Sequence, residues 1–139
     1  MEYAVGAVIA LVVGLFATLV GFDKDRAFYP TVMVVIASYY ALFAVVGGSI
    51  HSLLLESAVM AVFLGLSVAG FKGSLWLVVA ALFLHGIFDF AHGAFISNPG
   101  VPGWWPAFCL SYDGVAAGYL AWRLTRSKVL ATSRPADQK

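Results

Sequence analysis

Three ionisable side chains occur close together within one long apolar segment of the sequence. His85, Asp89 and His92 lie in the stretch LHGIFDFAHG, residues 84–93, with four- and three-residue spacing. At about 100° per residue, helical geometry places all three on one stripe roughly 60° wide. Imidazole nitrogens and carboxylate oxygens at such spacing are typical ligands of a divalent metal ion, zinc above all. We therefore predict that His85, Asp89 and His92 bind a metal.

Two further carboxylates occur in other apolar segments and are candidates for the catalytic groups of the same site. Glu56 follows a short polar connection, and Asp113 lies four residues after Cys109, the only cysteine, on the same face of a helix. A carboxylate beside a metal-bound water can take its proton. We predict catalytic roles for Asp113 and Glu56, and leave a redox role for Cys109 open.

The composition indicates whether water or lipid surrounds the protein that carries these groups. Of 139 residues, 62% are hydrophobic and only 11% are charged, with a formal net charge of +1. A soluble domain of this length needs far more polar surface, whereas apolar runs of 18 or more residues are typical of membrane-spanning helices. The balanced charge gives no basic patch for a nucleic acid. The sequence therefore predicts a multi-pass membrane protein whose main partner is the lipid bilayer.

The apolar runs predict an all-α bundle of five transmembrane helices in one domain, residues 1–124. The expected spans are residues 3–22, 31–48, 53–71, 75–96 and 107–124. Their residues do not alternate between apolar and polar as barrel strands do. Residues 97–106 carry three prolines and two glycines, which predicts a loop. Residues 125–139 lack apolar periodicity and predict a polar tail.

The basic residues predict an orientation. Every Lys and Arg lies just after the first span, just after the third span, or from the last turn of the fifth span onward, so that five spans bring all of them to one side. Basic residues concentrate on the cytoplasmic side, which predicts an outside N-terminus and a cytoplasmic C-terminus, as in a bacterial inner membrane. Counting along the helices then places the predicted metal ligands, His85, Asp89 and His92, in the outer half of the bilayer. The catalytic candidates Glu56 and Asp113 lie in the same half.

The cluster distantly resembles the zinc site of the alkaline ceramidase-type hydrolases, in which Ser and Asp accompany a His-x3-His pair. Asp89 stands where that pair has its second His, and five spans replace seven, so the chain is not assigned to the family. The resemblance implies only that such a cluster can cut a lipid-borne bond. Together with the predicted ligands, it favours a metal-dependent enzyme, with zinc as cofactor, acting on a lipid or other membrane-soluble substrate.

Two other functions fit the same residues. A His and an Asp one turn apart can pass protons, as expected of a proton- or ion-coupled transporter or channel. Alternatively, polar groups that hydrogen-bond between helices would serve packing alone, as in a structural subunit of a membrane complex. Gly114 and Gly118 in the fifth span offer a close-packing face for a homo-oligomer.

Overall fold

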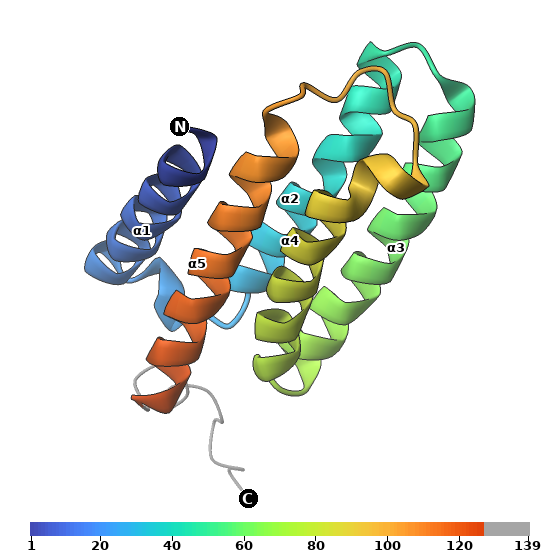
Figure 1. The fold of residues 1–139 in the computed structure, drawn as a ribbon. Coiled ribbons are helices and arrows are strands. Elements are labelled where there is room, and N and C mark those ends of the chain that lie inside the picture. Colours follow the sequence, from blue (N-terminus) through green and yellow to red (C-terminus); the bar gives the residue numbers. More distant parts are fainter. Residues whose placement is uncertain (127–139) are drawn as a thin grey trace, which may run out of the picture.

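Residues 1–126 form a bundle of five long helices in the computed structural model, which describes this part of the chain (Figure 1). The helices are α1 (Glu2–Val20), α2 (Phe28–Val46), α3 (Ile50–Lys72), α4 (Trp76–Phe95) and α5 (Trp105–Thr125), with a short 3-10 turn, η1 (Phe22–Lys24), after α1. Each long helix begins and ends within three residues of its predicted span, and the described residues contain no strand. The predicted polar tail lies, except for its first two residues, outside the described residues.

Four of the five long helices are apolar enough to cross a membrane. Among the described residues, α1, α2, α3 and α4 meet that criterion by length and composition. The fifth helix, α5, is less apolar because it carries Asp113 and Arg123 as well as several hydroxyl side chains. Its 21 residues extend over about 31 Å, enough to cross a hydrocarbon layer about 30 Å thick. The all-helical membrane fold is therefore supported, while the fifth span and the orientation stay predictions.

Local signals in the sequence explain where the helices begin and end. Gly21 follows α1 in the left-handed conformation, with φ of 91°, which closes the helix at low cost. Ser49 precedes α3 and accepts a hydrogen bond from the Ser52 backbone N–H, as an N-cap does. Pro106 occupies the first turn of α5, where its missing N–H costs nothing.

Small residues allow α1 and α5 to pack closely. The buried face of α1 consists of Gly6, Ala10, Gly14 and Ala17. A Cβ added at Gly6 would collide with Phe108 O and Ser111 Oγ of α5. Such faces let membrane helices gain van der Waals contact without large side chains. The α1 helix is held against the bundle mainly by this contact with α5.

The two ends of the bundle differ in charge. The α1–α2 and α3–α4 connections and the last turn of α5 lie at one end (Figure 1). This end, here called the basic end, carries all the Lys and Arg residues in the described part of the chain: Lys24, Arg26, Lys72, Arg123 and Arg126. The opposite end carries the connection between α4 and α5, residues 96–104, here called the proline loop.

The interior of the bundle also differs between its two ends, in the polarity of the buried side chains. Toward the basic end, Met33, Val78, Leu82 and Leu120 are completely buried and form an apolar core between α2, α4 and α5. Toward the proline loop, the buried side chains are largely polar. The outer faces of the helices expose large apolar side chains, as expected where lipid replaces water. This polar half of the interior holds the predicted site.

Candidate functional site

The polar stripe of α4 faces the interior of the bundle, as its spacing predicts. His85, Asp89 and His92 are 1%, 0% and 3% exposed. They lie on one face because positions i, i+4 and i+7 of a helix align. Apolar neighbours such as Leu84, Ile87 and Phe90 point outward instead and are exposed.

His85, Asp89 and Asp113 form a compact group, here called the His85 cluster. The His85 Nδ1 atom lies 2.8 Å from Asp113 Oδ2 on α5 and 3.4 Å from Asp89 Oδ2 on its own helix. One potential ligand atom from each of the three residues lies within 4.8 Å of the other two, and no other group of three such residues occurs in the described part of the chain. These three residues could therefore hold a metal ion.

Gly86 allows α4 and α5 to approach closely enough to assemble this cluster. A Cβ built on Gly86 would lie 3.1 Å from Asp113 Cβ and 3.3 Å from Leu110 O. Contacts this short are tighter than ordinary van der Waals packing. A glycine next to His85 therefore brings Asp113 within hydrogen-bond distance of the imidazole.

Several carboxylate oxygens of the cluster lack a well-formed hydrogen bond. Among the described residues, neither oxygen of Asp89 accepts one, although Asp89 Oδ2 lies 3.4 Å from His85 Nδ1, and Asp113 Oδ1 also accepts none. The Tyr40 hydroxyl and the Cys109 thiol lie close to Asp89, but the Tyr40 hydroxyl makes no well-formed hydrogen bond to the described residues. Buried polar atoms are normally satisfied, and unpaired buried carboxylate oxygens are especially costly. The site therefore favours an added cation or proton.

The basic residues are too distant to supply that cation. Within residues 1–126, every Lys and Arg lies at the basic end. Arg123, ten residues beyond Asp113 on α5, is about 15 Å farther along the helix axis. It pairs there with the fully buried Asp23, at 3.0 Å between Arg123 Nε and Asp23 Oδ2. The two carboxylates of the His85 cluster thus face a single imidazole.

His92 lies outside the His85 cluster and pairs with Glu56 of α3. The distance from His92 Nε2 to Glu56 Oε1 is 2.7 Å, and both side chains are buried. The sequence predicts His92 as a metal ligand and Asp113 as a catalytic group. The structure instead groups Asp113 with His85 and Asp89, because α5 packs against α4 at the level of His85, while α3 meets α4 at His92.

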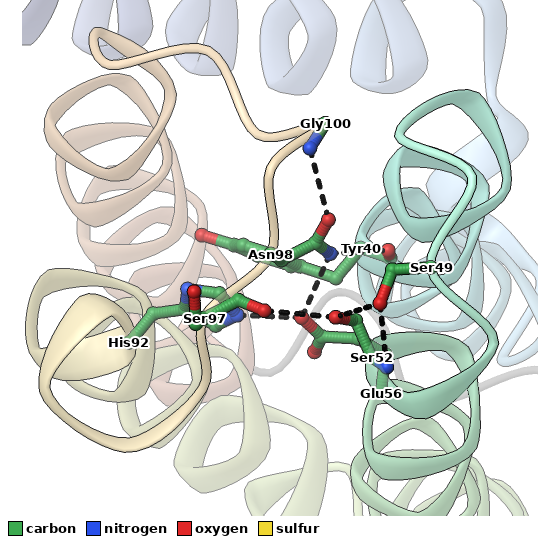
Figure 2. Close-up of polar contacts among 8 residues, drawn as sticks. All are labelled: Tyr40, Ser49, Ser52, Glu56, His92, Ser97, Asn98 and Gly100. Atoms are coloured by element: carbon green, nitrogen blue, oxygen red, sulfur yellow. Dashed lines mark hydrogen bonds and ion pairs between the residues drawn. The ribbon is translucent and has the colours of Figure 1, made fainter.

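The Glu56–His92 pair also anchors the proline loop (Figure 2). Asn98 donates hydrogen bonds to Glu56 Oε1, at 2.9 Å, and to the Tyr40 carbonyl, at 3.1 Å, and its own Oδ1 accepts one from Gly100 N. Ser52 donates to the Ser97 carbonyl at 2.8 Å. The loop is thereby fastened over the polar interior by side chains of α3 and by the backbone of α2.

Asn98 is the residue of this region that the sequence pattern does not single out. The sequence places Asn98 only in the proline-rich loop, where no periodicity indicates which side chain points inward. Of the two neighbouring tyrosines of α2, Tyr39 and Tyr40, the structure shows that Tyr40 faces inward, 2% exposed. Its ring stacks on His92 with centroids 4.2 Å apart and lies 6.4 Å from the ring of His85.

Aromatic side chains enclose the two histidines. Phe63 of α3 meets the His85 ring edge-to-face at 4.7 Å, and Phe88 meets His92 in the same way at 5.7 Å. Such walls exclude water and strengthen electrostatic interactions within the site.

In comparisons with protein-family models, with curated proteins and with solved structures, nothing matches this chain significantly.

Proposed function

We propose that this protein is an integral membrane metalloprotein that binds a divalent ion at His85, Asp89 and Asp113. The single observation that carries this proposal is the fully buried Asp89, whose oxygens accept no well-formed hydrogen bond and lie beside a second carboxylate and an imidazole. Two ionised carboxylates 4.8 Å apart or closer repel each other by about 3 kcal/mol or more at an effective dielectric constant of 20. A divalent ion converts that repulsion into attraction.

The donor set and its dimensions suit such an ion. Ligand atoms around a tetrahedral zinc ion, each about 2.0–2.1 Å from the metal, are roughly 3.4 Å apart. His85 Nδ1 lies 2.8 Å and 3.4 Å from the nearest oxygens of Asp113 and Asp89. Small side-chain rotations therefore suffice to place an ion between the three. One imidazole and two carboxylates suit zinc, the metal expected from the sequence, and also manganese.

The activity that this site supports best is hydrolysis of a lipid or other membrane-soluble substrate. His85, Asp89 and Asp113 would hold the ion, which would polarise a water molecule. Asp113 Oδ1, which accepts no hydrogen bond from the described residues, would take the proton of that water. The water oxygen would then bond to the acyl carbon as the bond to the leaving oxygen or nitrogen breaks, and the leaving group would receive the proton from Asp113.

Metal analysis of the purified protein tests the proposal. We expect about one zinc or manganese ion per chain after loading and gel filtration without chelators, and its loss in the Asp89→Asn variant. Asp25→Asn is the matched control, because Asp25 is exposed in the α1–α2 connection. Wild-type protein without stoichiometric metal, or an Asp89→Asn variant that retains it, would contradict the proposal. Hydrolysis of ester- and amide-linked lipids in vesicles by the loaded protein then tests the enzymatic role.

A second candidate function, proton- or ion-coupled transport, is favoured by the arrangement around Tyr40. Its ring stacks on His92 of the Glu56–His92 pair, and its hydroxyl lies next to Asp89 of the His85 cluster. Two histidine–carboxylate pairs are thus joined by one side chain with an ionisable hydroxyl. Proton flux into liposomes that is abolished by Asp89→Asn, in metal-free protein, would support transport over hydrolysis. Loss of thermal stability alone would indicate a structural subunit.

The proposed location is a bacterial inner membrane, with the basic end toward the cytoplasm and the His85 cluster in the outer half. The gathering of basic residues at one end of the bundle supports this orientation. A homo-oligomer is proposed through α5, where a Cβ at Gly114 or Gly118 would meet no atom within 4 Å in residues 1–126. Cross-linking in membranes at Gly118→Cys, in a Cys109→Ala background, tests that contact.

A further inference from the structure

A second group of polar side chains lies directly beneath the proline loop (Figure 2). Glu56 Oε1 lies 2.7 Å from His92 Nε2 and accepts a hydrogen bond from the Asn98 side-chain nitrogen at 2.9 Å. Glu56 and His92 are 1% and 3% exposed, yet Glu56 Oε2 has no hydrogen-bond partner within residues 1–126. A buried carboxylate oxygen without a partner is costly, so this group favours a further positive charge.

The donor atoms of this group suit a divalent metal ion. Carboxylate oxygens and imidazole nitrogens bind zinc, and carboxylate and carbonyl oxygens bind manganese. The Asn98 side-chain nitrogen lies close to Glu56 Oε1, so turning the amide over brings its oxygen to the same place. An ion that replaces the present hydrogen bonds would therefore have three ligands: Glu56, His92 and Asn98.

Such an ion would be held less tightly than one in the His85 cluster. Only one of the three ligands carries a negative charge, whereas the cluster supplies two carboxylates. Turning the Asn98 amide over also gives up its hydrogen bonds with the Tyr40 carbonyl and with Gly100 N. The ion is therefore expected to bind here only briefly when the cluster is vacant.

An ion from water has one favourable way into the polar interior. Toward the basic end, the interior is filled by completely buried apolar side chains: Met33, Val78, Leu82 and Leu120. That end also carries every Lys and Arg of residues 1–126, and these repel a cation. The outer faces of the helices are apolar and are expected to meet hydrocarbon, where a charge is costly. An ion is therefore expected to enter beneath the proline loop.

The Glu56 carboxylate and its two neighbours lie on that way to the His85 cluster. His92 and Asp89 belong to the same inward stripe of α4 and are one turn apart, about 4.5 Å along the helix axis. The Tyr40 ring stacks on His92 with centroids 4.2 Å apart, and the Tyr40 hydroxyl lies close to Asp89. Polar atoms thus follow one another from His92 to the cluster.

We infer that Glu56, His92 and Asn98 form an uptake site, a second and weaker metal site at which a divalent ion binds on its way from water to the His85 cluster. The inference rests on the proposed function in one respect, because the cluster is the destination of the ion. The existence of the weaker site is a separate claim and is measured separately.

Manganese uptake by the metal-free, full-length protein in lipid nanodiscs tests the inference, with the EPR signal of free manganese as the readout. We expect Glu56→Gln to bind one ion per chain, as the wild type does, but about tenfold more slowly, because a carboxylate at the entrance concentrates cations. Glu2→Gln is the matched control. It removes the same charge from an exposed side chain at the same end of the bundle, so uptake should keep its rate.

The weaker site is measured directly in the Asp89→Asn variant, in which the cluster is disabled. We expect this variant to bind one manganese ion per chain at high concentration and to lose it on gel filtration. Adding Glu56→Gln should abolish the binding. Adding Asn98→Asp should instead strengthen it about tenfold, because a second carboxylate then lies beside Glu56. This gain tests the site even where Glu56→Gln disturbs folding.

The outcomes separate the uptake site from the proposed function. Equal uptake rates in Glu56→Gln and the wild type, or weak binding that depends on neither Glu56 nor Asn98, would overturn the uptake site and leave the metalloprotein. A wild type that keeps no ion after gel filtration but shows weak binding dependent on Glu56 would overturn the proposed function and leave the weaker site. Absence of all manganese binding would overturn both.

Discussion

The closest contact behind the His85 cluster can be perturbed by a single methyl group. In a Gly86→Ala variant, the new Cβ would lie 3.1 Å from Asp113 Cβ and 3.3 Å from Leu110 O. Carbon atoms pack best at about 3.5–4.0 Å, so α4 and α5 must separate by roughly 0.5 Å at this level. The distance of 2.8 Å between His85 Nδ1 and Asp113 Oδ2 would then lengthen by a similar amount.

Two opposing effects determine how much Gly86→Ala changes the free energy of unfolding. Overpacking in a well-packed interior costs about 1–3 kcal/mol, whereas Gly to Ala in a helix gains up to about 1 kcal/mol. We therefore expect a net loss of about 1–2 kcal/mol in the free energy of unfolding. The lengthened distance, about 3.3 Å, is close to the roughly 3.4 Å between the ligands of tetrahedral zinc, so metal affinity should stay nearly unchanged.

Gly93 provides the matched control on the same helix. A Cβ at Gly93 would meet no other atom within 4 Å in the described part of the chain, so Gly93→Ala should be neutral or stabilising. Thermal unfolding in detergent and titration with zinc and manganese measure both quantities in both variants. If Gly86→Ala matches Gly93→Ala in melting temperature, or if Gly86→Ala abolishes metal binding, the account of the close α4–α5 contact is refuted.

Three further predictions concern the contacts that hold the bundle together. Arg26→Ala should lower the free energy of unfolding by about 1–2 kcal/mol, because the guanidinium donates hydrogen bonds to carbonyls at the end of α3. Lys24→Ala is the control, because Lys24 is exposed and its replacement should leave the free energy of unfolding almost unchanged. Arg123→Met should lower the free energy of unfolding by about 3–5 kcal/mol, because it leaves Asp23 buried without its ion-pair partner. The double variant Arg123→Met with Asp23→Leu should recover much of that loss. Asn98→Ala should raise hydrogen exchange in the proline loop, because two of the hydrogen bonds that anchor it are lost.

Each of these predictions has a clear contrary result. Equal melting temperatures for the Arg26 and Lys24 variants would show that the cap at α3 contributes nothing. A double variant no more stable than Arg123→Met would contradict the burial cost assigned to Asp23. Ser97→Ala keeps the backbone carbonyl that accepts from Ser52, so exchange rising equally in this variant and in Asn98→Ala would contradict the role of the amide.

The inward stripe of α4 could be predicted from the sequence because it depends on local geometry. Residues 85, 89 and 92 align on any regular helix, and the apolar runs of a membrane helix are long enough to be recognised directly. The buried face of α5 followed from the same rule, which placed Cys109 and Asp113 together. The observed helix ends lie within three residues of the predicted ones because Gly21, Ser49 and Pro106 are clear signals for the end or start of a helix.

The pairing of histidines with carboxylates could not be predicted, because it depends on how neighbouring helices are arranged. Counting residues gave only the depth of Glu56 and Asp113, and both were compatible with either histidine. The partner of His85 is decided by the close approach at Gly86, which places α5 at that level. Asn98 was missed for a related reason, since a loop side chain shows no periodicity that would point it inward.

X-ray absorption spectroscopy of the zinc-loaded protein tests the central claim most directly, because it counts the imidazole ligands of the bound ion. We expect one imidazole and otherwise oxygen ligands, a spectrum unchanged in His92→Ala, and loss of the bound zinc in His85→Ala. Two imidazoles around the ion, or a spectrum altered by His92→Ala and not by His85→Ala, would contradict the assignment of the metal site to His85, Asp89 and Asp113.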